Sequence, residues 1–379
     1  MSPENNNPTQ DIASAAFLSR EPQRITIREL DQILEHCYRL DASDITIQTG
    51  MPIYSEIYGR LYPNTKRALT HTEVGSILNA IYGANGTAQL LTGQDIDTNY
   101  EVRPNRMVRL RYRVNGTACL VEGHQAIQIT LRSIPTNPPR LTDMQLPQAI
   151  EEAMTPNDGI IYITGATGSG KSTLLASMIR HIAEDPNCHR KILTYEAPIE
   201  FVYDELNTTS AIVSQSEIPL HLPSFAAGVR NALRRKPRLI LVGESRDAET
   251  IAASLEAALT GHPVYTTLHT NGVPETLRRL VGTFPQEERD GRTIDIIETM
   301  RLIIWQQLVP TVDGKRTPLR EYLIFDDRIR DELLNIKPTE VTEKTRELLL
   351  QYGQPMQVDA KLKLEAGLIS EETFKRFNK

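Results

Sequence analysis

The sequence predicts an α/β protein of two domains, a small N-terminal α/β domain and a larger C-terminal domain built on a parallel sheet. Its 379 residues, of which 40% are hydrophobic and 24% charged, allow two or three domains with their own cores. In the second half, short apolar strands alternate with helical patterns, which is typical of βαβ units. In the first half, one strand alternates strictly between apolar and charged residues.

A glycine-rich loop between an apolar strand (160–163) and an apolar helix is the most specific feature of the sequence. It consists of Gly165, Ala166, Thr167, Gly168, Ser169, Gly170, Lys171 and Ser172, and Thr173 continues into the helix. In this G-x-x-x-x-G-K-[ST] pattern the backbone N–H groups wrap a phosphate, Lys171 adds a positive charge and Ser172 can hold Mg²⁺ at a helix start. A plain Gly/Ser turn would need both glycines, the Lys-Ser pair and both flanking elements to coincide.

Composition narrows the class of protein further. The net charge of −6 argues against a surface that generally coats nucleic acid. No apolar run approaches the roughly 18 residues that span a bilayer, and the first ten residues are polar, so we expect a cytoplasmic protein. The three cysteines, Cys37, Cys119 and Cys188, are widely spaced, which fits reduced thiols.

The N-terminal domain is expected over residues 23–132, after a flexible tail over residues 1–22. Thr26 and Glu29 have the spacing of a reciprocal helix cap, and Thr70 and Glu73 repeat it before a second helix. A proline-rich segment, 133–146, is expected to be a stiff linker. Residues 147–379 then form the second domain, with helices at its C-terminal end.

Three arginines share one face of the strand in this N-terminal domain. Arg109, Arg111 and Arg113 alternate with Val108, Leu110, Tyr112 and Val114. Such a row is more often a solvated face than a site. Guanidinium groups also clamp phosphate oxygens, and proximity to a nucleotide would favour that second interpretation.

Three strands of the second domain end at residues able to serve phosphate chemistry. The strand 191–195 leads to Glu196, 239–243 leads to Glu244, and 263–268 lies between His262 and His269. Because ligands bind at the carboxyl ends of parallel strands, Glu196, Glu244 and His269 are expected to converge near a γ-phosphate. Phosphoryl transfer to water needs a carboxylate for the water, Mg²⁺ and cations. Each glutamate could instead simply end a strand, and the histidines could be core hydrogen bonders.

Four segments in order carry a resemblance to a known family. Residues 165–173, 192–202, 240–247 and 260–270 resemble the Walker A, Asp box, Walker B and His box of the secretion ATPase superfamily. This group contains pilus-retraction and type II and type IV secretion ATPases. Residues 111–115 resemble its N-terminal arginine strand, and 306–310 resemble the start of its C-terminal part. Residues 42–50 and the overall length are most similar to the Dot/Icm-type and conjugative-plasmid members.

The resemblance implies a PAS-like N-terminal domain joined to a RecA-like P-loop ATPase domain that uses ATP and Mg²⁺. It implies a homohexamer, peripheral to the membrane, that is recruited to the cytoplasmic face of a bacterial inner membrane by secretion-machine components. By position, Lys171 and Ser172 bind phosphate and Mg²⁺, Glu196 and Glu244 serve the water and the metal, and His262 and His269 form the His box. Arg111 and Arg113 would reach the nucleotide, and Arg230 or Arg246 would add further cations.

Two functions remain open from the sequence. The first is a motor that hydrolyses ATP and couples this to protein transport or assembly, as in type IV secretion, conjugation or pilus retraction. The second is a nucleotide-gated scaffold that turns over negligibly. Both need Lys171, whereas only the motor needs Glu196 and Glu244, whose presence favours it. A DNA translocase would need a basic, aromatic-lined channel, and with 6% aromatic residues no direct nucleic-acid contact is predicted.

Overall fold

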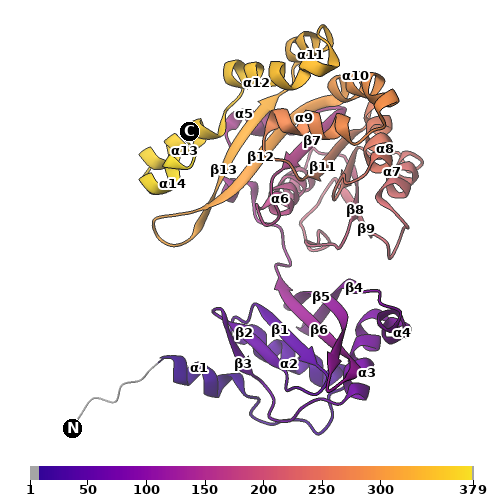
Figure 1. Ribbon diagram of the computed structural model, residues 1–379, viewed down its shortest axis with the longest axis vertical. Helices are drawn as coiled ribbons and strands as arrows, with labels where there is room; N and C mark the ends of the chain where they lie inside the picture. The colour runs from indigo at the N-terminus through magenta and orange to yellow at the C-terminus, as the bar shows by residue number, and fades with distance from the viewer. Residues whose placement is uncertain (1–7, 378–379) are drawn as a thin grey trace, which may run out of the picture. The chain divides into compact units, whose positions relative to one another are not determined.

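The computed structural model describes residues 8–377 of the chain, which divide into two compact units. The first ends at Thr136 and the second begins at Asn137 (Figure 1). Both mix helices with a β-sheet, as the sequence predicts. Among the described residues no helix has the length and apolar character that crossing a membrane requires.

The first unit is a six-stranded antiparallel sheet in the order β3-β2-β1-β6-β5-β4, packed with four helices (Figure 1). Its strands are β1 (Asp44–Gln48), β2 (Tyr54–Ile57), β3 (Arg60–Pro63), β4 (Ile96–Asn105), β5 (Val108–Val121) and β6 (His124–Ile134). Its helices are α1 (Pro8–Ala16), α2 (Ile27–Arg39), α3 (His71–Tyr82) and α4 (Gly86–Leu91).

Both predicted helix caps in this unit are confirmed. The N–H of Thr26 donates to the Glu29 carboxylate before α2, and the N–H of Thr70 donates to Glu73 before α3. The apolar stripe of α2 from Leu30 to Cys37 is buried against the sheet. Each helix therefore begins where a side chain satisfies backbone N–H groups that lack an intrahelical partner.

The segment expected to be a flexible tail is partly ordered. Residues 8–16 form α1, Ala16 is fully buried, and its carbonyl accepts a hydrogen bond from the Asn64 side chain at 3.0 Å. The end of the predicted tail is therefore not flexible in this structure, because Ala16 lies in the core of the first unit and Leu18 packs against it. The start of the predicted tail, residues 1–7, lies outside the described residues.

The second unit holds a seven-stranded sheet in the order β13-β12-β7-β11-β10-β8-β9. The six strands from β12 to β9 are parallel, and only β13 runs antiparallel, at the edge. The strands are β7 (Gly159–Thr164), β8 (Lys191–Glu196), β9 (Ile212–Glu217), β10 (Leu239–Val242), β11 (Pro263–Leu268), β12 (Met300–Pro310) and β13 (Arg316–Ile324). All residues of β7, β10 and β11 are buried, as expected for strands covered on both faces.

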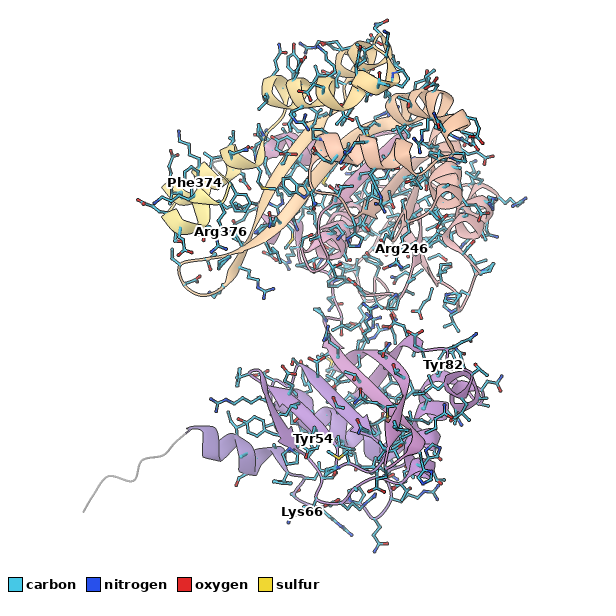
Figure 2. All side chains as sticks on the ribbon, in the orientation of Figure 1. Tyr54, Lys66, Tyr82, Arg246, Phe374 and Arg376 are labelled. Carbon is cyan, nitrogen blue, oxygen red and sulfur yellow. The ribbon has the colours of Figure 1, made fainter. Side chains whose placement is uncertain are left out.

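Helices cover both faces of this sheet and form separate apolar cores. One core involves α7, α8, α9 and α10, and the other involves α5, η1 and α6. The elements are η1 (Leu141–Met144), α5 (Gln148–Ala153), α6 (Lys171–Glu184), α7 (Phe225–Leu233), α8 (Ala248–Leu259), α9 (Val273–Gly282), η2 (Gln286–Glu288), α10 (Arg289–Thr299), α11 (Asp327–Leu334), η3 (Pro338–Glu340), α12 (Val341–Tyr352), α13 (Met356–Glu365) and α14 (Glu371–Lys375). The helical C-terminal end includes α14, which carries Phe374 and is followed directly by Arg376 (Figure 2).

The predicted linker is only partly free of regular structure. Strand β6 extends through Ile134, Leu141 is buried in the core with α6, and Arg180 donates to the Pro138 carbonyl at 2.6 Å. Most of the proline-rich segment is therefore fastened to the second unit. The prolines, which lack an N–H, suit a segment that leaves a sheet ladder.

Candidate nucleotide site

The glycine-rich loop joins β7 to α6 with three residues in the left-handed region. Gly165 has a φ of 144°, Gly168 of 75° and Gly170 of 83°. Such angles are strained for residues with a Cβ, so the loop depends on glycine at these positions. A Cβ on Gly165 would also lie 2.3 Å from the Gln306 carbonyl oxygen of β12, so this turn sits directly against the neighbouring strand.

Lys171 is buried at the start of α6, with 8% of its surface exposed. Its Nζ donates to the carbonyls of Gly165 at 2.9 Å and Ala166 at 2.8 Å. Burial lowers the pKa of its ammonium group, while the nearby carboxylates of Glu244 and Glu200 act in the opposite direction. The lysine is thus a cation held by the loop itself, at the point where the sequence pattern places a phosphate.

Glu244 lies just beyond the carboxyl end of β10 and is held by two side chains. Its carboxylate pairs with Arg246 at 2.7 Å and contacts His269 Nε2 at 3.3 Å, and 16% of the side chain is exposed. Arg246 projects from the same loop (Figure 2). The structure therefore brings two predicted residues, Glu244 and His269, into contact.

His269, directly after β11, also connects this pair to the glycine-rich loop. Its Nδ1 lies 3.5 Å from Lys171 Nζ. Because an ammonium group can only donate, Nδ1 is the acceptor, and a proton on Nε2 can then be donated to Glu244. A neutral imidazole satisfies both contacts, and Lys171, His269 and Glu244 form a continuous chain at one edge of the sheet.

Glu196 ends β8 at the same edge, next to the Glu244 loop. A Cβ on Gly243 would lie 3.3 Å from the Glu196 Cα. One carboxylate oxygen of Glu196 accepts hydrogen bonds from Thr194 Oγ1 at 2.6 Å and from Gln215 Nε2 at 3.1 Å. These neutral donors fix the direction of the carboxylate. Gln215, on β9, was missed by sequence reasoning; it lies two residues after Val213, on the same face of the strand, and both side chains are half-buried.

His262 does not join this group. His262 directly precedes the first residue of β11, which pairs with Gly159 at the beginning of β7. His269 directly follows the last residue of β11. Six strand residues span roughly 20 Å, so the two histidines lie at opposite ends of β11. His262 Nδ1 lies 3.2 Å from the Ala257 carbonyl at the end of α8. The structure therefore brings His269, and not His262, to Lys171 and Glu244, because strand β11 separates the two histidines.

Ser172 and Thr173 lie in the first turn of α6 with Lys171, where the helix dipole favours an anion. The Ser172 hydroxyl and the Glu244 carboxylate are oxygen donors of the type that Mg²⁺ prefers. Within residues 8–377, the buried hydroxyl of Ser169 has no hydrogen-bond partner. The open glycine turn, the buried cation and these oxygen donors fit a bound nucleoside phosphate with Mg²⁺.

Arg111 and Arg113 belong to the first unit, on β5. Arg113 pairs with Asp97 of β4 at 2.6 Å, and the neighbouring Arg109 pairs with Glu101 at 2.7 Å. Arg111 stands opposite Glu101 in the ladder and is 5% exposed. Two arginines of the predicted row, Arg109 and Arg113, thus form ion pairs with acidic residues of the neighbouring strand. Arg230 of the second unit pairs with Glu249 on α8.

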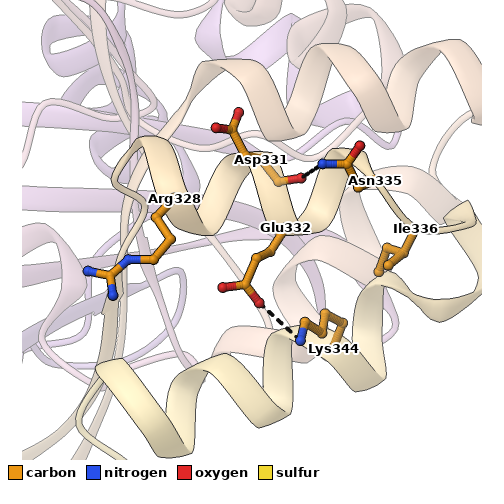
Figure 3. A pocket seen from close by; sticks show the side chains of 6 residues that line it. All are labelled: Arg328, Asp331, Glu332, Asn335, Ile336 and Lys344. Atoms are coloured by element: carbon orange, nitrogen blue, oxygen red, sulfur yellow. Dashed lines mark hydrogen bonds and ion pairs between the residues drawn. The ribbon is translucent and has the colours of Figure 1, made fainter.

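A hollow of about 550 Å³ lies between α11 and α12, apart from the glycine-rich loop (Figure 3). Arg328, Glu332 and Lys344 contribute to its lining, and Lys344 is paired with Glu332 at 3.0 Å. The Arg328 guanidinium lies over the ring of Tyr352. These three charged side chains are engaged with neighbouring side chains, and the hollow contains none of the predicted site residues.

The parallel sheet with helices on both faces, the glycine-rich loop after β7 and the buried lysine define a P-loop nucleotide-binding domain of the ATPase type. The particular family follows from comparison with known proteins. The sequence model of the family described as "Type II/IV secretion system protein" matches residues 20–345, and the chain belongs to this family of secretion ATPases.

Relatives with known names are similar over most of the chain. The crystal structure of the ATPase DotB from Legionella pneumophila is 66% identical, with a TM-score of 0.91, and the match covers 95% of this chain and 98% of that one. A structure of the pilus retraction motor PilT with bound ADP is 31% identical, with a TM-score of 0.79, covering 93% and 97%. A "Twitching motility protein" of Neisseria gonorrhoeae is 33% identical over 305 residues, 80% of this chain and 78% of its own length. These matches confirm the predicted family and the predicted similarity to Dot/Icm-type members.

Proposed function

We propose that this protein is an ATP-hydrolysing hexameric motor of a Dot/Icm-like type IV secretion or conjugation system, related in mechanism to pilus retraction. The observation that carries the proposal is the chain of contacts from Lys171 through His269 to Glu244 at the carboxyl edge of the parallel sheet. Its named relatives include the ATPase DotB and the retraction motor PilT. We place the motor in the cytoplasm, at the inner face of the inner membrane, where components of the secretion machine would recruit it.

The side chains at this edge suit hydrolysis in distinct ways. ATP with Mg²⁺ would supply a phosphoryl group whose transfer to water spreads negative charge over its three oxygens. Lys171 would offset that charge, and Ser172 would hold the metal together with Glu244. Glu244, aligned by Arg246 and His269, orients the attacking water, and Glu196, fixed by Thr194 and Gln215, assists it. In this proposal His269 reports on the phosphate through its contact with Lys171, and His262 has no part.

A guanidinium group from the arginine strand would complete the site in an assembled ring. Arg113 is 42% exposed in its pair with Asp97, and such a pair contributes less than about 1 kcal/mol, so it can be exchanged for a phosphate contact at little cost. An arginine delivered to the transferred phosphoryl group adds roughly 10³-fold or more to the rate. We infer that Arg111 and Arg113 act on the nucleotide of a neighbouring subunit.

The function is tested by steady-state phosphate release measured on the purified chain, together with its native mass. We expect Mg²⁺-dependent ATP turnover in a hexamer. Tight nucleotide binding and a hexameric mass without turnover would point to the nucleotide-gated scaffold instead, and a monomer at working concentration would remove the ring from the proposal.

Shared sites are tested by mixing two inactive variants, Arg113→Ala and Glu244→Gln. If arginine and glutamate come from different subunits, mixed rings contain interfaces that pair an intact Arg113 with an intact Glu244, and part of the activity returns. Arg132→Ala, which removes an exposed arginine paired with Asp44 on the same sheet, is the control for Arg113 and should leave turnover unchanged. Absence of recovery in verified mixed rings would contradict a site completed across subunits.

A further inference from the structure

A buried glutamine lies directly beneath the glycine-rich loop. Gln306 is on β12, the strand that runs beside β7, and is 3% exposed (Figure 1). A Cβ on Gly170 would lie 2.9 Å from Gln306 Nε2, and a Cβ on Gly165 would lie 2.3 Å from its carbonyl oxygen. Gly165 and Gly170, at the two ends of the loop, therefore both pack directly against Gln306. Any residue with a Cβ at either position would clash with Gln306.

The Gln306 side chain makes a specific contact with the loop backbone. Its Nε2 donates to the carbonyl oxygen of Ser169 at 2.7 Å, out of contact with solvent. The peptide between Ser169 and Gly170 is planar and trans, so its C=O and N–H point in opposite directions. Holding the carbonyl toward β12 therefore turns the Gly170 N–H away from β12 and into the loop, where backbone N–H groups receive phosphate oxygens.

An arginine determines which end of the Gln306 amide faces the loop. Arg320 stands opposite Gln306 in the β12–β13 ladder, is 2% exposed and donates from Nε to Gln306 Oε1 at 2.9 Å. Burial lowers its pKa to about 10, so it keeps its charge at neutral pH. A guanidinium group has no acceptor, so the amide oxygen must face Arg320 and the amide nitrogen must face Ser169. The arginine thus fixes the orientation that the loop requires.

Arg320 is itself held from two further elements. Its Nη1 donates to the carbonyl of Gln145, before α5, at 3.2 Å, and its backbone N–H donates to the Asp359 carboxylate on α13 at 2.8 Å. Two residues that are far apart in the sequence, Gln145 and Asp359, therefore both accept hydrogen bonds from Arg320. A buried arginine is costly unless its donors are satisfied, so this placement is a specific feature of the domain.

We propose that Gln306 and Arg320 are positioning residues that set the Ser169–Gly170 peptide of the glycine-rich loop for phosphate binding. The inference rests on the proposed nucleotide function, since it assigns the loop a phosphate ligand. Neither residue touches the nucleotide; both act through the loop backbone. A buried polar pair that only stabilised the β12–β13 ribbon would affect unfolding and leave nucleotide affinity unchanged.

Substitutions of Gln306 in the full-length chain separate these roles. Gln306→Glu keeps an acceptor for Arg320 but cannot donate to Ser169 and repels its carbonyl oxygen. Gln306→Leu removes both contacts at similar volume. Gln307, the next residue of the same strand, is exposed, so Gln307→Leu is the matched control. The dissociation constant of Mg²⁺-ADP is measured by calorimetry, beside a thermal unfolding curve for each variant.

We expect both Gln306 variants to bind Mg²⁺-ADP about tenfold to a hundredfold more weakly than the wild type, the effect of misdirecting one hydrogen bond to a charged ligand. Gln307→Leu should bind like the wild type. Folded Gln306 variants with wild-type affinity would overturn this inference and leave the proposed function intact. A wild-type chain that binds no nucleotide would instead contradict the proposed function. Should Gln306→Leu fail to fold, Gln306→Glu, which keeps the contact with Arg320, decides the matter.

Discussion

The two sheets of this protein hold their charged side chains in different ways. In the antiparallel sheet of the first unit, arginines and acids pair between strands along a half-exposed face, as in Arg113 with Asp97 and Arg132 with Asp44. In the parallel sheet of the second unit, β7, β10 and β11 are buried throughout, and charged groups occur only beyond their ends. Strands covered on both faces have no place for a charged side chain, so charged groups gather at their carboxyl ends.

This difference predicts different consequences of removing a charge. Exposed cross-strand pairs contribute little individually, because water screens them and the side chains lose freedom on pairing. At the carboxyl edge, Lys171, His269 and Glu244 contact one another, and losing one changes the surroundings of the others. Charge removal beside Lys171 should therefore act mainly on activity, whereas in the first unit, apart from Arg111 and Arg113, removal of a well-held charge such as Glu73 should act on stability. The following predictions test that contrast.

The largest effect is expected for Lys171→Met. Methionine has a similar length and no charge, so it fills the buried position while removing the cation that the loop holds. We expect ATP turnover to fall by about 10³-fold. Lys171 is only 8% exposed, so the unfolding curve of the variant must be measured as well. Turnover at the wild-type rate would show that the loop does not act on phosphate.

The first unit offers the contrasting case in Glu73. Its carboxylate accepts hydrogen bonds from Arg67 at 2.7 Å and from the backbone of Ile25 and Thr70 at 3.1 Å. The hydrogen bond to Arg67 is the main cause that lowers its pKa from 4.5 to about 2. Because the folded state holds the ionised form more tightly, this contribution is present above pH 4.5 and is lost as the pH falls toward 2.

Glu73→Gln should therefore lower the free energy of unfolding of the first unit by about 2 to 3 kcal/mol at neutral pH. The difference from the wild type should shrink between pH 4.5 and about 2. Hydrogen exchange of α3 amides in the full chain measures it locally. Glu35→Gln, which removes an exposed pair with Arg39 on α2, is the control and should cost less than about 0.5 kcal/mol. A constant difference across this pH range would contradict the assigned pKa shift.

The two ends of β11 give the smallest and most local test. His269→Gln removes the imidazole between Lys171 and Glu244 and should lower turnover by about tenfold, the cost of about one hydrogen bond. His262→Gln, at the opposite edge, should leave turnover unchanged. Steady-state rates of the two variants make the comparison within one strand. Equal losses would mean that position along the sheet does not decide the role of these histidines.

Much of the fold could be predicted from local patterns. The spacing of Thr26 and Glu29 predicts the start of α2, and the apolar runs around the glycine-rich loop predict β7 and α6. The carboxyl-edge rule then places Glu244 beside His269 without knowledge of the strand order. These predictions succeed because the decisive interactions are short in sequence or common to all parallel sheets.

Other features depend on contacts between distant segments, which one sequence does not reveal. Gln306 contacts Ser169 across 137 positions, and Arg320 reaches Gln145 across 175. Lys171 is buried because its ammonium turns back onto the loop carbonyls, a conformation that the motif alone does not specify. His262 and His269 were grouped as the His box that the family resemblance implies, yet strand β11 between them carries them to opposite ends of the strand.

The central claim is that the carboxylate of Glu244 is needed for the chemical step far more than for nucleotide binding. It is tested most directly by Glu244→Gln in the full chain, with Mg²⁺-ATP affinity and steady-state turnover measured on the same preparation. Glu249→Gln, an exposed carboxylate on α8 paired with Arg230, is the matched control. An amide keeps the shape but cannot accept a proton, so we expect affinity close to that of the wild type and turnover about 10²-fold lower or more. Hydrolysis at the wild-type rate by Glu244→Gln would contradict the account.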